Sequence, residues 1–428
     1  MNLEGLVWVA PFALLLGAIA VMPLANKHWW EKWSPAVSLG LGALVALHAI
    51  LAGDSEVLVH TAVEYVSFIC LIGSLFIIAG GIHIKVKGES TPAVNCLFLA
   101  IGAVLANLLG TTGASMVLIR PWLRMNKYRI TAFHVVFFIF IVSNAGGSLT
   151  PIGDPPLFLG YLKGVPFFWV TKAMFLPWLA VVGLLIAIFF VLDTKNFAKA
   201  PVDVRVKETG AGEEWRFEGK RNVFFLLAVV GSVFIQSPSF LREAVMVAAA
   251  FLSFKMTPKA VHEMNDFEFG PIREVALLFM GIFATMIPAL EWLETNAASL
   301  GIRTAGHFYW GSGVLSSVLD NAPTYLNFLS AALGLFTAHA SGALPHGGHD
   351  PRVAELLATH GKVICAISAG SVFFGAMTYI GNGPNFLVKS IADRAKAHTP
   401  SFFGYILRYS LPYLLPVLAL VWFLFFRG

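Results

Sequence analysis

Two aspartates, Asp154 and Asp320, interrupt long apolar stretches of the sequence. Asp154 follows the run HVVFFIFIV within SNAGGSLTPIGDPPLFL, and Asp320 lies in LDNAP. A carboxylate whose pKa is raised by burial can exchange a proton for a cation near neutral pH. An ionised side chain deep in a bilayer is costly, so it is usually rare, paired and functional. These residue types therefore predict a site that holds either protons or a small cation such as Na+.

Small polar residues accompany both aspartates. We expect Asp154 to lie opposite a helical turn at Gly110–Thr112, and Asp320 to lie opposite Ser368, Ser371 and Asn382. Hydroxyl, amide and freed backbone oxygens are the hard ligands that suit a small cation. The candidate binding residues, with Na+ held at Asp154 and Asp320, are Ser143, Asn144, Thr150, Thr111, Thr112, Asn321, Thr324, Ser368, Ser371 and Asn382.

Each of these residues also has a simpler interpretation. Asp154 and Asp320 could serve only as caps of broken helix ends, because an aspartate side chain accepts hydrogen bonds from the first backbone N–H groups of a helix. For Ser143, Asn144, Ser148 and Thr150, packing or capping is an alternative to ligation. Glu64 falls at an expected membrane edge, where solvation is its default role.

The composition indicates the class of protein. Of the 428 residues 57% are hydrophobic and 12% are charged, against about 25% charged in an ordinary soluble chain. Apolar runs of roughly 20 residues, long enough to cross a bilayer, recur along the sequence. The chain is therefore predicted to be an all-α polytopic membrane protein whose surroundings are lipid. The excess of basic residues fits loops beside a membrane and does not argue for nucleic acid.

Loop charge orients the expected crossings, because Lys and Arg accumulate on the cytoplasmic side. All basic loops fall on one side of the membrane, and the neutral or acidic loops on the other, only if two apolar stretches do not cross it. These stretches, Ala93–Leu123 and Gly306–Leu335, are therefore expected to enter and leave on the same side, as re-entrant hairpins. Both termini are then extracytoplasmic. The ten expected crossings are Leu6–Leu24, Pro35–Leu51, Ala62–Ile82, Thr131–Leu162, Ala173–Leu192, Val223–Gln236, Phe240–Phe254, Ile272–Leu290, Gly361–Ile391 and Phe402–Phe426.

This order of segments predicts an inverted repeat of two five-crossing halves. Residues 1–192 form the first repeat, 193–222 a cytoplasmic linker and 223–428 the second repeat. Each half has a hairpin after its third crossing and a broken fourth crossing. The sequences echo this order weakly, with PIGDPPLFL in the first half and YIGNGPNFL in the second. Matching broken helices in two inverted halves indicate a secondary transporter with its site at the breaks.

The breaks SNAGGSLTPIGDPP and SAGSVFFGAMTYIGNGP, with the expected hairpin tips, resemble the ion transporter superfamily. They are most similar to its Na+/H+ antiporter branch, which includes citrate-transporter-like proteins. The dicarboxylate branch carries Ser-Asn-Thr at both tips, whereas this chain has GTTGAS and LDNAPT, so the resemblance gives carboxylate binding less support. The resemblance implies a homodimer of scaffold domains with mobile transport domains, in a bacterial inner membrane.

The sequence is compatible with two functions. The first is antiport of Na+ or Li+ against protons through Asp154 and Asp320. The second is symport of citrate or a dicarboxylate with Na+ or protons, in which Thr111, Thr112 and the tip around Asn321 and Thr324 would bind the anion. No Walker-type loop, His-Glu metal motif or Ser-His pairing is present in the sequence, so neither an ATP-driven pump nor an enzyme is expected. No cofactor is expected beyond the transported Na+ and H+.

Overall fold

The chain folds almost entirely into helices in the computed structural model, which describes residues 3–85, 90–201, 216–235, 237–337 and 350–427. Within these residues, eight helices are long and apolar enough to cross a membrane. The predicted all-α polytopic membrane protein is thereby confirmed. In the first part of the chain the elements are α1 (Leu3–Ala25), α2 (Lys27–Ala52), α3 (Ser55–Gly80), β1 (His83–Lys85), α4 (Pro92–Met125), α5 (Ala132–Ile141), η1 (Ala145–Leu149), α6 (Pro155–Leu162) and α7 (Phe167–Lys199).

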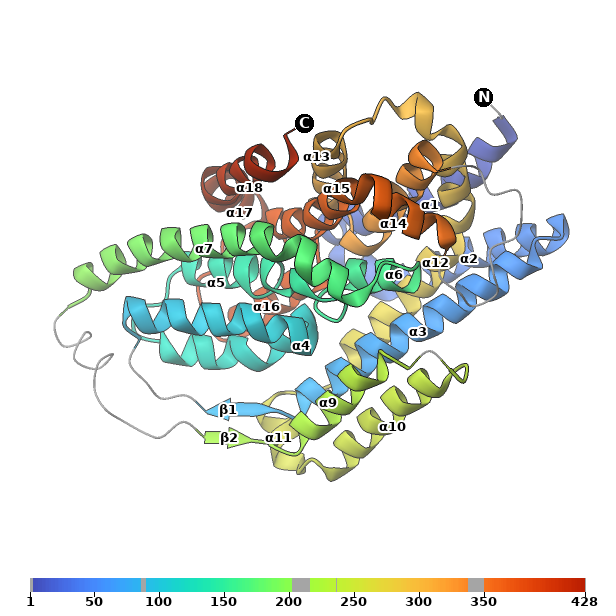
Figure 1. Cartoon of the computed structure of the whole chain (residues 1–428). Helices are drawn as coiled ribbons and strands as arrows, with labels where there is room; N and C mark the ends of the chain where they lie inside the picture. Colours follow the sequence, from blue (N-terminus) through green and yellow to red (C-terminus); the bar gives the residue numbers. More distant parts are fainter. Residues whose placement is uncertain (1–2, 86–89, 202–215, 236, 338–349, 428) are drawn as a thin grey trace.

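The second part begins with the strand β2 (Arg216–Glu218), which pairs antiparallel with β1 (Figure 1). Its helices are α9 (Asn222–Ser232), α10 (Leu241–Met256), α11 (Lys259–Met264), α12 (Gly270–Asn296), η2 (Ala297–Leu300), α13 (Ala305–Ser316), α14 (Asn321–Phe336), α15 (Pro351–Phe374), η3 (Gly375–Met377) and α16 (Gly383–Arg394). The C-terminal crossing is one continuous helix with π-helical turns, through α17 (Phe402–Tyr405), η4 (Ile406–Leu414), α18 (Leu415–Val421) and η5 (Trp422–Phe426).

The element α4 is a hairpin and not one straight helix. Gly110, at its middle, has φ 72° and ψ 156°, a conformation that favours glycine. Asn95 near one end donates from Nδ2 to Oδ1 of Asn126 at the other end, at 2.8 Å. A straight helix would separate these two residues by about 46 Å at about 1.5 Å per residue. The chain therefore turns back at Gly110, as expected for the first re-entrant hairpin.

The second hairpin consists of α13 and α14. The ring of Phe308 in α13 lies 6.2 Å from the ring of Phe328 and 6.0 Å from that of Phe336, both in α14. A Cβ on Gly311 would lie 2.8 Å from the Phe328 ring, so the two helices approach closely there. Asp320 lies at the turn between them.

The two interrupted crossings follow the same backbone path. Thr150 and Thr378 are both extended, with φ −134° and −137°. Asp154 and Asn382, four residues later, are extended as well, with φ −144° and −155°. Each helix then restarts with proline in its first turn, where a missing N–H costs little. This likeness fits the predicted repeat locally; the inverted repeat of residues 1–192 and 223–428 stays a prediction.

Glycine allows each interrupted crossing to fold tightly on itself. A Cβ on Gly153 would lie 2.0 Å from the carbonyl oxygen of Gly147, and one on Gly381 would lie 2.6 Å from that of Gly375. No larger residue fits such an approach. The two Gly pairs therefore hold Asp154 and Asn382 at equivalent corners.

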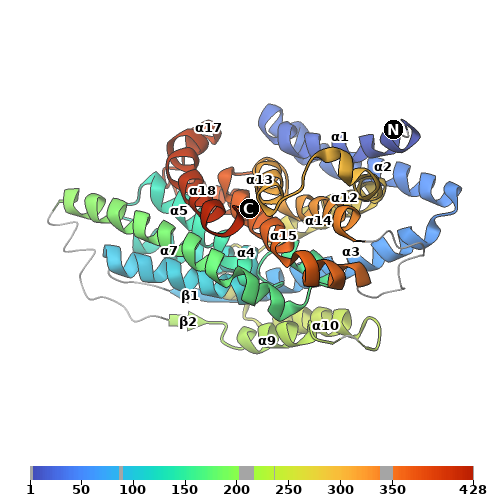
Figure 2. The same ribbon diagram turned by 45° about the horizontal axis from the view of Figure 1, so that its top comes forward.

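The helix α5 is buried among other helices. Its run of apolar residues is hydrophobic on every side, and Phe137, Phe138 and Phe140 are fully buried. A helix of this kind must be surrounded by other helices. In Figures 1 and 2 it lies beside α4, α7 and α16, while α2, α3 and α12 form a second group of helices.

Two boundaries differ from the sequence prediction. The crossings Val223–Gln236 and Phe240–Phe254 correspond to α9 and α10, whose 11 and 16 residues are shorter than a full crossing of about 20 residues. The linker expected at 193–222 begins in a helix, because α7 continues to Lys199. Asp193 is fully buried there, since Arg129 and His134 pair with it. Residues 202–215 of the linker lie outside the described residues.

Candidate functional site

The carboxylate of Asp154 is the centre of the candidate site. Asp154 lies between η1 and α6 and is 1% exposed. Its Oδ1 accepts from Thr111 Oγ1 at 2.7 Å and from Asn382 Nδ2 at 3.2 Å. Its Oδ2 accepts from Asn321 Nδ2 at 2.6 Å. These donors come from the first hairpin, the second break and the second hairpin, so all four breaks meet at one carboxylate.

Donors from both halves of the chain surround Asp154. Asp154 receives one donor from its own half of the chain and two from the other half, Asn321 and Asn382. The corner residues of the two breaks are in direct contact, because Asn382 Nδ2 donates to Asp154 Oδ1 at 3.2 Å. Each break leaves polar groups unpaired, and polar side chains from the other segments satisfy them.

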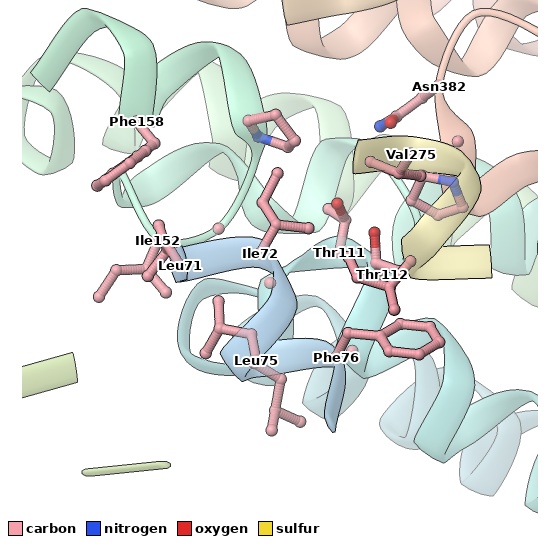
Figure 3. Close-up of a pocket in the computed structure, with 18 of the residues that line it drawn as sticks. Leu71, Ile72, Leu75, Phe76, Thr111, Thr112, Ile152, Phe158, Val275 and Asn382 are labelled. Carbon is pink, nitrogen blue, oxygen red and sulfur yellow. The ribbon is translucent and has the colours of Figure 1, made fainter. Parts of the chain in front are cut away.

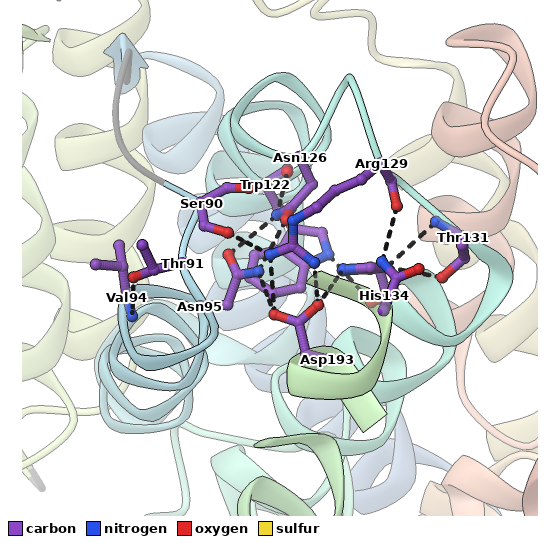
Figure 4. A network of polar contacts seen from close by, with 11 residues as sticks. Ser90, Thr91, Val94, Asn95, Trp122, Asn126, Arg129, Thr131, His134 and Asp193 are labelled. Carbon is purple, nitrogen blue, oxygen red and sulfur yellow. Dashed lines mark hydrogen bonds and ion pairs between the residues drawn. The ribbon is translucent and has the colours of Figure 1, made fainter. Parts of the chain in front are cut away.

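Asp154 has no basic partner among the residues that the structure describes. All three of its donors are neutral groups. Asp193 shows the contrasting case (Figure 4): its carboxylate is also buried, but Arg129 donates to it, His134 Nε2 lies 3.0 Å away and Asn95 donates at 2.8 Å. A buried charge that lacks a counter-charge is costly. The Asp154 position is therefore suited to a cation or a proton.

Asp320 has a different environment from Asp154. Its Oδ1 accepts from the backbone N–H of Ala322 at 3.0 Å, so it caps α14. The capping role considered for both aspartates thus fits Asp320, whereas the side chain of Asp154 makes no capping bond. Asp320 is partly exposed and also lines a cavity. In the described part of the chain no basic side chain pairs with it.

A cavity of about 200 Å³ is lined by Asp320 and by Gly153 and Pro155, the two neighbours of Asp154 in the chain. One wall is apolar and comes from Leu71–Phe76 of α3 and Pro271–Phe279 of α12. The other wall carries the first hairpin tip, Asp320 and Asn382; Figure 3 shows the side chains of Thr111, Thr112 and Asn382 beside Ile72, Phe76 and Val275. Of the described residues that line it, Asp320 alone is ionisable and none is Lys, Arg or His. The described lining therefore offers no basic side chain that could pair with an anion.

The expected ligands of the first half do not all reach Asp154. Thr111 reaches Asp154, but Thr112 lines the cavity instead. Ser143 shares a hydrogen bond with Ser115 at 2.8 Å, and its backbone oxygen accepts from Asn382. Thr150 donates to the backbone oxygen of Asn107 at 2.7 Å, which ties the break to the hairpin. The expected packing or capping role therefore describes Thr150 better than ligation.

Asn144 joins the two breaks directly. Its Nδ2 donates to Oδ1 of Asn385 at 2.7 Å, and its Oδ1 accepts from Asn382 at 3.1 Å. Ser148 donates only to the carbonyl oxygen of Ala145, within its own turn. Asn144 thus holds Asn382 in place beside Asp154.

The expected ligands of the second half also divide into two groups. Thr324 donates to the backbone oxygen of Asp320 at 2.9 Å, and Ser368 donates to the backbone oxygen of Ile364 at 2.8 Å, so neither hydroxyl donates to the Asp320 carboxylate. Ser371 and Asn321 are fully buried, and Ser371 Oγ and Asn321 Oδ1 have no hydrogen-bond partner among the described residues. Buried oxygens without partners are open to a cation. Ser371 was expected opposite Asp320; no contact between their side chains is found in the described residues.

Sequence reasoning missed the residues that stabilise the breaks. Asn107 donates to Gly146 O at 2.7 Å and accepts from the N–H of Leu149. Asn385 donates to two carbonyl oxygens of the second break. Both satisfy backbone groups that a broken helix leaves unpaired. A single asparagine within an apolar run was the only available signal.

A protein-family model described as "Putative citrate transport" matches residues 2–426 of the chain. No curated protein matches the sequence.

Proposed function

The chain belongs to the family described as "Putative citrate transport" and is an integral, multi-pass membrane transporter; from this premise we propose that it exchanges Na+ for protons. The observation that carries the proposal is the carboxylate of Asp154, which is buried, accepts three hydrogen bonds from neutral groups and has no basic partner in the described residues. A cation or a proton supplies the missing positive charge.

The proposed exchange needs one carboxylate that holds either ion. With Asp154 ionised, Na+ binds between Asp154 and Asp320, and buried oxygens such as Ser371 Oγ and Asn321 Oδ1 complete its shell. A proton that reaches the carboxylate from the opposite side of the membrane removes this negative charge, and Na+ leaves. Because the two ions compete for one group, influx of one drives efflux of the other.

Symport of citrate or a dicarboxylate with Na+ or protons is the second candidate, and the family description favours it. The anion would lie between the hairpin tips, bound by Thr111, Thr112, Asn321 and Thr324. The cavity is less suited to it, because its only ionisable lining residue among those described, Asp320, is an acid. A tricarboxylate there would need cations bound beside it.

Reconstituted proteoliposomes with an internal pH dye distinguish the two. Antiport predicts that a pulse of NaCl alone moves protons across the membrane in a direction opposite to Na+. Citrate symport predicts no response to NaCl and a response, with accumulation of labelled citrate, only when citrate is added. The second result would replace the antiport proposal.

We also propose the orientation and assembly of the chain. Both termini are extracytoplasmic, and the linker 193–222 is cytoplasmic, in a bacterial inner membrane, as the loop charges indicate. In support, Arg120 of one basic segment pairs with Asp266 of another at 3.1 Å. The proposed assembly is a homodimer, which light scattering of the purified protein measures directly.

A further inference from the structure

An ion pair joins α3 to the end of α6. It lies on the face near the acidic segments GDSEVLVH (residues 53–60) and EWLETNAASLG (residues 291–301), called the acidic-loop face below. Glu64 of α3 lies 2.7 Å from Lys163, which follows α6, and 3.4 Å from His60. The sequence suggested a solvated Glu64, but its side chain is only 9% exposed because Lys163 covers it. The side chain of Lys163 is 22% exposed. Partial burial leaves such a pair less screened by salt than an exposed one.

A second ion pair joins α12 to the start of α15 on the same face. Arg352 of α15 pairs with Glu294 of α12 and, at 2.8 Å, with Asp350. The N–H of Asp350 donates to the carbonyl oxygen of Lys163 at 3.1 Å. The two cations, Lys163 and Arg352, therefore belong to one connected group, while the two acids lie on α3 and α12.

The cavity wall lies at other positions along these same two helices. Leu71 is seven positions after Glu64 in α3, or about 10 Å along the helix. Phe279, the last residue of α12 in the cavity wall, is about 22 Å from Glu294 by the same measure. Along α3 and α12, the ion pairs to Lys163 and Arg352 thus lie at positions distinct from the cavity wall.

The face with the cavity has a weaker link across the same boundary. Arg120 of α4 pairs with Asp266 at 3.1 Å, but the side chain of Asp266 is 72% exposed. An exposed pair of this kind contributes little. The ion pairs among the described residues are thus more buried near Glu64 and Arg352 than near Asp266.

We propose that Glu64–Lys163 and Glu294–Arg352 form a latch that holds the acidic-loop face closed while the cavity is open. In secondary transporters, one bundle rocks against another around a fixed site. The same aspartates can reach the acidic-loop face only if both pairs break. The latch therefore sets the equilibrium between the two states, since each pair exists in only one of them.

Thiol labelling of a buried position beneath the latch tests this proposal. Thr61 is buried and precedes Glu64 by three residues, so both lie on one face of α3. A Thr61→Cys variant, with Cys70 and Cys96 replaced by alanine and Cys365 kept, is purified in lipid nanodiscs and treated with an impermeant maleimide in Na+-free buffer. Adding Glu64→Gln and Glu294→Gln is expected to raise the labelling rate at position 61 about fivefold or more.

Two controls separate the latch from general loosening. Arg120→Gln removes the exposed pair on the other face and should leave the rate at position 61 unchanged. Labelling of Cys365, which is buried in α15, should stay constant. The charge exchange Glu64→Lys with Lys163→Glu re-forms the ion pair. It should return the labelling rate to that of the Thr61→Cys parent protein, in which Glu64 and Lys163 are intact.

Three results would overturn the latch: an unchanged rate in the Gln variants, an equal rise at Cys365, or charge exchange that leaves labelling fast. The assay contains no transported ion. Its outcome is therefore independent of whether the chain carries Na+ or citrate.

Discussion

Replacement of Asp154 by asparagine should abolish ion binding but leave the stability of the fold nearly unchanged. A negative charge about 4 Å from a cation contributes about 4 kcal/mol at an effective dielectric constant of 20, which is roughly a thousandfold in affinity. Asp154→Asn removes this contribution together with the exchangeable proton. We therefore expect Na+-dependent proton movement to fall to the level of empty liposomes.

The stability of the same variant should change little. An asparagine keeps one acceptor oxygen, but its amide group meets at least one of the donors Thr111, Asn321 and Asn382, at a cost of about 1–3 kcal/mol. The loss of a buried charge that lacks a basic partner in the described residues offsets this cost. The melting temperature in detergent should thus stay near that of the unmodified protein.

Asp193→Asn is the matched control, because Asp193 is equally buried but ion-paired. Breaking a buried pair by removing one partner costs about 3–5 kcal/mol. This variant should melt at a clearly lower temperature while its remaining folded protein keeps Na+-dependent proton movement. A full Na+ response in folded Asp154→Asn protein would refute the role of Asp154. A lower melting temperature for Asp154→Asn than for Asp193→Asn would refute the view that only Asp193 is stabilised by basic partners.

Three further outcomes are expected. Asp320→Asn should weaken Na+-driven proton movement in proteoliposomes and lower stability by less than about 1 kcal/mol, because asparagine still caps α14; an unchanged Na+ response would exclude Asp320 from the site. Gly153→Ala should unfold the first break, since its Cβ would lie 2.0 Å from Gly147 O; normal melting and transport would contradict this. In intact cells, Ala298→Cys should react with an impermeant thiol reagent and Lys127→Cys should not; the reverse pattern would invert the proposed orientation.

The breaks and hairpins were predictable because local sequence determines them. Glycine, proline and polar residues within apolar runs mark places where a helix cannot continue, and the basic residues on both flanks of Ala93–Leu123 require an even number of passes. The structure has the turn at Gly110 within this stretch. The all-α membrane class followed from composition in the same way.

The partners of the polar side chains could not be predicted, because they depend on contacts between distant segments. Asn144 and Asn385 are 241 positions apart, and nothing near either one indicates the other. Glu64 was expected in solvent for the same reason, since its partner Lys163 belongs to another helix. The sequence could thus place Asp154 in a break without showing that donors from both halves would reach it.

The mixed origin of these donors has a consequence for how the protein is made. Thr111 precedes Asp154 by 43 positions, whereas Asn321 and Asn382 follow it by 167 and 228. When α5 and α6 leave the ribosome and enter the bilayer, the carboxylate has only its first donor. A lone acid at depth raises the cost of insertion, and the chain must bear that cost until α14 and α16 have been synthesised. Synthesis of the second half therefore supplies Asn321 and Asn382, the two donors that complete the hydrogen bonding of Asp154.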